Sequence, residues 1–515
     1  MHPSISPVIV GRSVMDRSRQ VKAFQSLGGP WKTGARALAA ICALALAACV
    51  GQPATVETDP VTALGPTAEI AFVVADAETG AVVTAQAADR PMIPASTAKI
   101  ATMVSALELL GPDFRFQTRV LATGAPDAAG VLSGDLILAG GGDPLLTPQD
   151  LYGLAVRLRD LGLKRVAGRF LYDESLLPAV PAINPDQPAE ARYNPGVSAL
   201  SVDFNRWRLM WRREGAGAPD LTRLPPVDAH RATFGNRAQG PGRAVLWDGG
   251  AWTIGADADD EGDRFLPVKA PGLATAELFR RLAAQAGITL PSPEAGTAPK
   301  EARVATAIAG LPLAEVARLG LEHSNNLVSE LTGLTAARLL DGRPDTLDAS
   351  AAALSGWLGK AVDSTITNVD WRGWDLPNHS GLSRHARVTA SQMAAVLRFA
   401  HGRRYGGWPF ASLLPTAGFR KAFRDRFLTE AAAGRIWAKT GTLHYAKGLV
   451  GYLMGADGRT RVFALFIADP AARRAYDALS PDVRSAPDAQ RRALAWINTA
   501  EQAEQAIVLE WLARF

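Results

Sequence analysis

Cysteine is almost missing from this chain of 515 residues. Only two occur, Cys42 and Cys49, and both lie near the N-terminus. The long remainder therefore has no thiol with which to form a disulfide. Patterns for metal binding are equally scarce, because the seven histidines are scattered and form no His-x-x-x-His pair, and there is no cysteine cluster. We therefore expect neither a metal site nor a cofactor.

Positive charge is scarce outside the N-terminal region. The whole chain has a formal net charge of +5, but residues 1–36 alone contain six Lys or Arg against one Asp. Without residues 1–48 the net charge is about 0. The basic balance therefore belongs to a leader, and the composition gives no reason to expect binding to nucleic acid.

The apolar run ALAAICALALAAC (37–49) is too short to anchor the chain as a transmembrane helix, but it suits the core of an export signal. Its end, LAAC (46–49), resembles a bacterial lipobox. We expect a lipoprotein-type signal peptide over 1–48, lipidation of Cys49 and a tether over 49–66. The protein would then be exported to the periplasm and anchored to a bacterial membrane by its lipid. A plain signal peptide with an incidental Cys49 is the alternative.

The predicted elements describe one α/β domain interrupted by a long insertion. A β-hairpin is expected over 68–86, and a strand pair is expected around the turn Asp457-Gly458. Helical patterns begin near Pro94 and end at Gly111, and they return at 311–358 and 488–514. We therefore place the main domain at 67–120 plus 303–515. The segment 121–302, with short apolar strands and many Gly and Pro breaks, is expected to form one or two mainly β-rich accessory domains.

Ser96 and Lys99 stand one turn apart near the start of the helix expected after Pro94, so their side chains share one face. A serine hydroxyl is nearly inert until a base removes its proton. A lysine can act as that base only as a neutral amine, which requires burial or nearby positive charge to lower its pKa. An N-cap serine followed by a solvated lysine would give the same pattern, so the pair needs further support.

Two further motifs follow in the chain. Ser324 and Asn326 form a Ser-x-Asn element where an apolar-periodic helix begins, although an N-cap serine would also explain it. The stretch 439–442, Lys-Thr-Gly-Thr, leads towards a strand-like run. The same Lys-Thr-Gly tripeptide occurs at 32–34, but that copy precedes the export signal and is expected to be removed with it.

Ser-x-x-Lys, Ser-x-Asn and Lys-Thr-Gly in this order form the signature of penicillin-binding proteins and serine β-lactamases, which the chain resembles. Lys99 and Ser324 are 225 positions apart (324 minus 99), more than a simple β-lactamase-like domain needs. Class C penicillin-binding proteins place their extra domains there. Segments such as AGGGDPLL (139–146) and SGLSRHARVT (380–389) are also similar to that family. The resemblance covers about 68–470 and implies the penicillin-binding, transpeptidase-like α/β fold.

The resemblance also implies roles for individual residues. The catalytic residues would be Ser96, Lys99, Ser324, Asn326 and Lys439, and the substrate-binding residues would be Thr440, Gly441, Thr442 and Asp173. Lys439 is expected to lower the pKa of Lys99 and to attract an anionic substrate. Gly441 is expected to leave a strand edge open for the substrate, and the amides of Ser96 and Thr442 to form the oxyanion hole. A loop carboxylate with no contact to substrate is the alternative for Asp173.

The expected activity is that of a D-alanyl-D-alanine carboxypeptidase/endopeptidase of the DacB type, with peptidoglycan peptides as substrates and β-lactams as inhibitors. A serine β-lactamase and a non-catalytic lipoprotein that binds the cell wall are the alternatives. The chain departs from the family pattern at two places. Asn378-His379 stands where the family has Asp-Gly, and GFRKAF (418–423) replaces a Gly-Thr-Leu stretch. These departures concern the shape of the site and leave the nucleophile and base unchanged.

Overall fold

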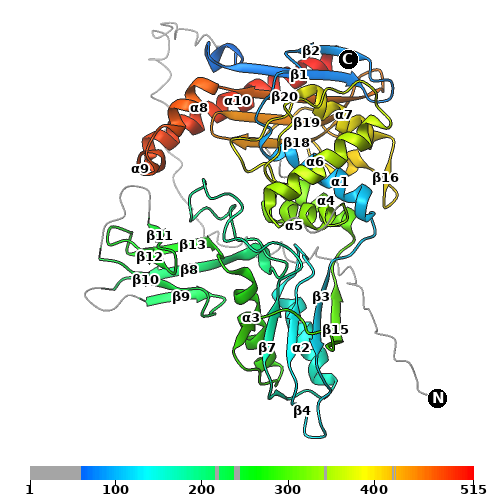
Figure 1. Cartoon of the computed structure of the whole chain (residues 1–515). Helices are drawn as coiled ribbons and strands as arrows, with labels where there is room; N and C mark the ends of the chain where they lie inside the picture. The colour runs from blue at the N-terminus through cyan, green and yellow to red at the C-terminus, as the bar shows by residue number, and fades with distance from the viewer. Residues whose placement is uncertain (1–58, 215–219, 237–243, 341–344, 420–422, 424) are drawn as a thin grey trace, which may run out of the picture.

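The computed structural model describes residues 59–214, 220–236, 244–340, 345–419, 423 and 425–515 (Figure 1). The expected signal peptide, Cys49, most of the tether and the Lys-Thr-Gly copy at 32–34 lie outside these residues. Figure 1 shows two parts, a sheet flanked by helices above and the inserted region below. Within the described part of the chain, no helix is both long enough and apolar enough to cross a membrane.

The upper part is built on a five-stranded antiparallel sheet in the order β18-β19-β20-β1-β2. It joins the two ends of the chain, because N-terminal strands lie beside C-terminal ones. Its strands are β1 (Glu69–Asp76), β2 (Val82–Gln86), β18 (Ile436–Leu443), β19 (Ala446–Met454) and β20 (Thr460–Ala468). The two expected hairpins are therefore confirmed.

Both faces of this sheet are buried under helices. Along β20, Val462, Ala464 and Phe466 enter one hydrophobic cluster, and Phe463, Leu465 and Ile467 enter another, as the period of two in a strand requires. The first face carries η2 (Ala95–Ala98), α1 (Lys99–Leu110) and α7 (Ala390–His401), and the second carries α10 (Pro487–Arg514). The remaining helices of this part are η1 (Thr62–Leu64), α4 (Leu313–His323), α5 (Asn326–Ala337), α6 (Leu347–Asp363), η4 (Phe410–Leu413), α8 (Pro470–Asp477) and α9 (Pro481–Ser485), with a small hairpin of β16 (Arg404–Tyr405) and β17 (Trp408–Pro409).

The inserted region begins with a mixed sheet in the order β14-β7-β5-β3-β15. Its strands are β3 (Gln117–Ala122), β5 (Leu136–Ala139), β7 (Phe170–Asp173), β14 (Pro293–Ala295) and β15 (Arg303–Ala309), and the short pair β4 (Val131–Leu132) and β6 (Arg165–Val166) lies beside it. Because β3 pairs with β15, the junctions lie near 117 and 309 and not at the expected 120/121 and 302/303. Two helices, α2 (Pro148–Asp160) and α3 (Pro271–Gln285), share the core of this sheet, so this half of the insertion combines its strands with helices.

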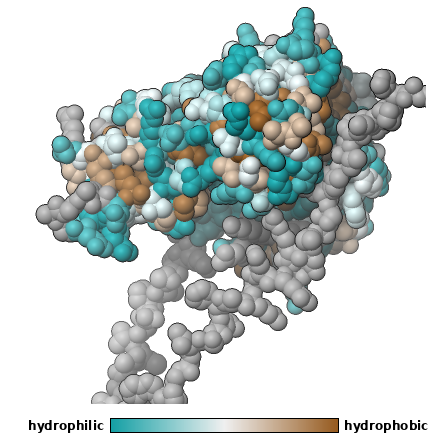
Figure 2. All heavy atoms as spheres, turned by 90° about the horizontal axis from the view of Figure 1, so that it is seen from below, coloured by the Kyte–Doolittle hydropathy of each residue, from teal (hydrophilic) through white to brown (hydrophobic). Residues whose placement is uncertain are grey.

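The second half of the insertion is β-rich, as expected. It has one three-stranded sheet of β8 (Arg206–Arg212), β9 (Asp220–Leu224) and β13 (Glu261–Pro267), and another of β10 (Ala232–Phe234), β11 (Val245–Trp247) and β12 (Trp252–Ile254), preceded by η3 (Asp203–Asn205). The side chains of Trp207, Trp211 and Trp252 form its core. Seen from below in Figure 2, apolar side chains gather in separate patches among polar ones.

Candidate active site

The Ser-x-x-Lys pair lies where η2 passes into α1. Pro94 is the N-cap of η2 and Lys99 is the first residue of α1, which places Ser96 about one turn before the α-helix proper. The Lys99 side chain is fully buried, whereas Ser96 is half-buried. The Lys99 Nζ is 2.9 Å from Ser96 Oγ. The predicted juxtaposition of nucleophile and amine is therefore present, and the solvated-lysine alternative is wrong.

The other neighbours of the Lys99 amine fix the direction of proton transfer. Its Nζ donates to Asn326 Oδ1 and to the carbonyl oxygen of Ser380, both at 2.7 Å. A carbonyl and an amide oxygen can only accept hydrogen bonds. A neutral amine has two N–H groups, and these two oxygens use both. Its lone pair then points at the Ser96 hydroxyl, which is the arrangement that a general base needs.

Electrostatics favour that neutral form. Burial is the main cause that lowers the pKa of Lys99 well below its ordinary value of 10.5, and the charge of Lys439 lowers it further, while Glu330 opposes them. Burial together with the charge of Lys447 lowers the pKa of Lys439 to about 7. The sequence-based expectation that Lys439 depresses the pKa of Lys99 agrees with this arrangement.

Ser324 and Asn326 lie at the junction of α4 and α5. Ser324 ends α4 in the left-handed conformation, with φ of 52° and ψ of 38°, while Asn325 is the N-cap of α5 and accepts from the amide of Val328. Ser324 is therefore the C-cap of α4 and not the helix N-cap that the alternative interpretation required. Asn326 is also held by the inserted region, because its Nδ2 donates to the carbonyl of Tyr193 at 2.8 Å. That bond turns the Oδ1 of Asn326 towards Lys99.

A buried carboxylate supports the Ser380 carbonyl from behind. Glu330 lies one turn after Asn326 on α5 and is fully buried. Its two oxygens accept from the amides of His379 and Ser380, at 3.1 and 2.9 Å. Burial is the main cause that raises the pKa of Glu330. Sequence reasoning missed Glu330, although a charged residue four positions after Asn326 on an apolar helix was a signal.

The departure at Asn378-His379 preserves the loop that carries Ser380. The Oδ1 of Asn378 accepts from the amides of Gly381 and Leu382, so an amide oxygen closes the turn. His379 is buried, and burial lowers its pKa to about 3, so the imidazole is neutral. The ring fits because residue 333 is glycine: a Cβ there would lie 2.3 Å from the His379 ring.

The Lys-Thr-Gly-Thr stretch lies at the outer strand of the sheet, β18. Ile436–Ala438 bond to the segment 415–417, and beyond them no further strand pairs with this edge among the described residues. Lys439 and Gly441 face α1, whereas Thr440 and Thr442 face α10. The open edge is consistent with the expected docking of substrate as an added strand.

Gly441 has a second reason to be glycine. A Cβ at this position would lie 2.5 Å from the carbonyl oxygen of Pro94 and 3.1 Å from Thr97 Cγ2. The partner of Gly441 across the sheet is Gly448, where a Cβ would also approach Thr97 Cγ2, at 3.3 Å. The two glycines therefore let the segment that bears the nucleophile rest directly on the sheet.

A pocket of about 290 Å³ opens over these residues. Its lining contains the predicted Ser96, Ser324, Asn326 and Thr442, and it adds Gln187, Tyr193, Arg384, His444, Arg473 and Ile497 among others. The predicted Lys99, Lys439, Thr440 and Gly441 are not among the residues that line it. The pocket thus combines a nucleophile, hydroxyl and amide groups, and two arginines at its rim.

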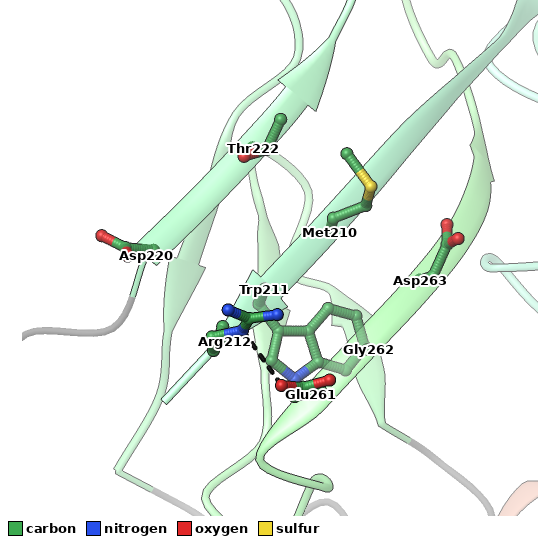
Figure 3. A pocket seen from close by; sticks show the side chains of 8 residues that line it. All are labelled: Met210, Trp211, Arg212, Asp220, Thr222, Glu261, Gly262 and Asp263. Atoms are coloured by element: carbon green, nitrogen blue, oxygen red, sulfur yellow. Dashed lines mark ion pairs between the residues drawn. The ribbon is translucent and has the colours of Figure 1, made fainter. Parts of the chain in front are cut away.

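A larger hollow of about 520 Å³ lies on the outer face of β9, β8 and β13 in the inserted region (Figure 3). Figure 3 shows Asp220 and Glu261 near Arg212, which pairs with Glu261 at 3.0 Å, and Asp263 farther along β13 beside Met210. The hollow is an open sheet face with paired charges. It has no nucleophile beside a base, so the chemistry belongs to the smaller pocket.

Asp173 does not line the active-site pocket. It ends β7, and its carboxylate accepts from the amides of Ser175 and Ala298, at 3.0 and 2.7 Å. These bonds tie two loops of the inserted region together. A contact with substrate remains a prediction for this residue.

Comparisons with known proteins agree with this site. The profile of the D-Ala-D-Ala carboxypeptidase 3 (S13) family matches residues 59–481. The carboxypeptidase DacB of Mycolicibacterium smegmatis is 30% identical over 428 residues, which cover 80% of this chain and 79% of that protein. The D-alanyl-D-alanine carboxypeptidase of Actinomadura sp. is 27% identical over 420 residues, 75% of each chain.

The fold agrees as well. The crystal structure of penicillin binding protein 4 from Haemophilus influenzae matches with a TM-score of 0.72 at 20% identity, covering 88% of this chain and 99% of that one. The same protein has been solved in complex with a β-lactam, and that structure matches with a TM-score of 0.70. The predicted fold class and the resemblance to class C penicillin-binding proteins are thus confirmed. The chain belongs to the D-Ala-D-Ala carboxypeptidase 3 (S13) family of serine-type carboxypeptidases.

Proposed function

We propose that the chain is an exported enzyme that cleaves D-Ala-D-Ala termini and peptide cross-links of peptidoglycan through an acyl-enzyme on Ser96. The observation that carries this proposal is the environment of Lys99. Its amine lies 2.9 Å from Ser96 Oγ, and its two other neighbours are oxygens that only accept. This arrangement suits a neutral lysine that removes the proton of the serine.

The reaction follows from the positions of the groups. Ser96 Oγ attacks the carbonyl carbon of the penultimate D-Ala while its proton passes to Lys99. The amides of Ser96 and Thr442 stabilise the oxyanion. The hydroxyl of Ser324 gives its proton to the leaving amine and takes the proton held by Lys99, which leaves Lys99 neutral again. The C–N bond then breaks and leaves an ester on Ser96. Water hydrolyses this ester, with Lys99 again taking the proton.

β-Lactams are expected to acylate the same serine. The Haemophilus influenzae relative, which shares the fold, was solved in complex with a β-lactam, and this supports the expectation. A fast β-lactamase is disfavoured, because the described residues that line the pocket include no carboxylate to activate a deacylating water. Glu330 is fully buried and is not among the residues that line the pocket, so it has no access to a deacylating water there. A non-catalytic wall-binding protein is disfavoured by the intact pair of nucleophile and base.

Export and lipidation rest on the sequence of residues 1–58, which lie outside the described part of the chain. We propose cleavage before Cys49 and attachment of lipid to its sulfur. The mass of the mature N-terminal peptide tests this directly. A Cys49→Ser variant should be released from membranes, and an unmodified Cys49 in the mature chain would refute the anchor.

A labelled β-lactam tests the proposed chemistry. We expect one stable adduct, on Ser96, that disappears in Ser96→Ala, and digestion of purified muropeptides that releases D-Ala. The masses of the products from cross-linked muropeptides then measure the endopeptidase activity. An unlabelled Ser96 in the folded protein would refute the acyl-enzyme, and rapid loss of the adduct would favour the β-lactamase.

A further inference from the structure

A buried lysine lies directly beneath the pocket on the second face of the sheet. Lys447 is opposite Thr442 in the β18–β19 pairing, and its side chain is 2% exposed. Its Nζ donates to Thr442 Oγ1 at 3.0 Å. Thr442 itself is exposed and lines the active-site pocket. The ammonium of Lys447 is thus one hydrogen bond away from the substrate site.

The C-terminal helix α10 holds this lysine in place. Glu501 Oε2 accepts from the Lys447 Nζ at 2.9 Å, and Glu504, fully buried, lies 3.9 Å from it. Arg426 pairs with Glu504 at 2.9 Å, so two cations and two carboxylates form one balanced cluster. A buried charge is tolerated only when it is paired in this way.

The helix also reaches the pocket itself. Ile497, one turn before Glu501 on α10, is among the residues that line the pocket. The family profile ends at residue 481, whereas α10 runs over Pro487–Arg514. The support of Thr442 therefore comes partly from a helix beyond the region that the profile matches.

The hydrogen bond sets the direction of the Thr442 hydroxyl. Because Lys447 donates to Thr442 Oγ1, the oxygen acts as acceptor, and its own hydrogen is free to point into the pocket. A hydroxyl that donates, backed by a positive charge, suits a carboxylate. Arg473, also at the pocket, uses two of its five N–H groups on the carbonyl of His444 and on Asp477, and the others can add to the positive field of the pocket.

We propose that Lys447, anchored by Glu501 of α10, is a positioning residue that orients the Thr442 hydroxyl. Its positive charge also helps the enzyme to recognise the free C-terminal carboxylate of the peptide substrate. This inference rests on the proposed carboxypeptidase function. A binding role for Thr442 is already expected, and the new element is the dependence of that role on Lys447 and α10. The charge of Lys447 also lowers the pKa of Lys439, which shows that its field extends into the site.

The test compares a peptide ending in D-Ala-D-Ala with the same peptide as its C-terminal amide. In Lys447→Met, which keeps most of the length of the side chain but removes its charge, we expect kcat/KM for the carboxylate peptide to fall about tenfold, mainly through KM. For the amide peptide, kcat/KM should change less than twofold. Lys447→Arg should keep most of the discrimination. Lys360→Met, at an exposed lysine on α6, is the matched control.

A double-mutant cycle tests whether Lys447 acts through Thr442. Once Thr442→Val has removed the hydroxyl, Lys447→Met should cost little more, because the two changes break one interaction. Glu501→Gln should weaken discrimination, while Glu510→Gln, at an exposed glutamate of the same helix, should not. Should Lys447→Met fail to fold, the Arg and Glu501 variants carry the test. Unchanged discrimination in folded variants would overturn this inference alone, whereas failure of a labelled β-lactam to modify wild-type Ser96 would overturn the proposed function.

Discussion

The close approach of the nucleophile segment to the sheet makes Gly441→Ala a sharp perturbation. The new Cβ would lie 2.5 Å from the carbonyl oxygen of Pro94, whereas ordinary contact begins at 3.4 Å. The backbone on one side must therefore move by about 0.9 Å. Trimming a side chain cannot relieve the contact, since the obstacle is main chain. Ser96 follows Pro94 by two positions, so the displacement reaches the nucleophile.

The expected consequence is a slower acylation step. A misplacement of about 1 Å at a reacting group lowers the rate about 100-fold. Overpacking also destabilises, by about 1 to 3 kcal/mol, so the variant should remain folded in a protein of ordinary stability. Stopped-flow measurement with a chromogenic β-lactam separates the first-order acylation rate from the dissociation constant of the initial complex. We expect Gly441→Ala to lower the first-order rate constant of acylation. The dissociation constant of the initial complex should stay within a few-fold of wild type.

The matched control is Gly356→Ala on α6, where an added Cβ meets nothing within 4 Å. It should acylate at the wild-type rate and unfold at the same or a higher temperature. If Gly441→Ala is acylated at the wild-type rate, the backbone around Pro94 accommodates the new Cβ without displacing Ser96. A weaker initial complex with an unchanged rate constant would instead favour the docking of substrate along β18 as the main reason for Gly441.

Three further predictions concern charge, packing and a loop. Lys439→Gln removes a positive charge that keeps the pKa of Lys99 low. The pKa of Lys99 should therefore rise, and the acid limb of the pH profile for acylation should move to higher pH. An acid limb at the wild-type position would refute the coupling between the two lysines. Gly333→Ala should destabilise the protein by about 1 to 3 kcal/mol through its clash with His379, and adding His379→Ala should recover part of this loss in denaturant unfolding; additive losses would refute the contact. Asp173→Ala leaves two amides without their acceptor and should lower the free energy of unfolding by about 1 to 2 kcal/mol with acylation unchanged; a raised KM for peptide with unchanged stability would support contact with substrate.

Local patterns in the sequence were enough to predict the elements that carry the site. The helix after Pro94, its end at Gly111 and the C-terminal hairpins follow from short-range periodicity and turn residues, and the structure has them. Ser96 and Lys99 could be paired because their contact spans three positions. The resemblance carried by three ordered motifs then assigned Asn326 to the same site as Lys99, without any local signal.

What could not be predicted depends on contacts between distant segments. The carbonyl of Tyr193 orients Asn326 from 133 positions away, and a backbone oxygen leaves no mark in a sequence. Lys447 looked like an ordinary strand residue, because its partner Glu501 lies 54 positions later on a helix. The sequence-based boundaries of the insertion differ by a few residues from those of the structure, because the residues of β3 and β15 resemble strand residues of either domain. Only their mutual pairing assigns them.

The contacts of Lys99 also decide when the protein becomes reactive. The two oxygens that accept from its amine belong to residues 227 and 281 positions later, and the strand on which the nucleophile rests is later still. A chain emerging from the ribosome carries its serine early, yet its lysine is then solvated and charged. Because such non-local contacts form late in folding, the emerging protein holds no competent base. Completion of the fold thus assembles the base, and a truncated product that lacks Asn326, Ser380 and β18 is expected to leave Ser96 unactivated.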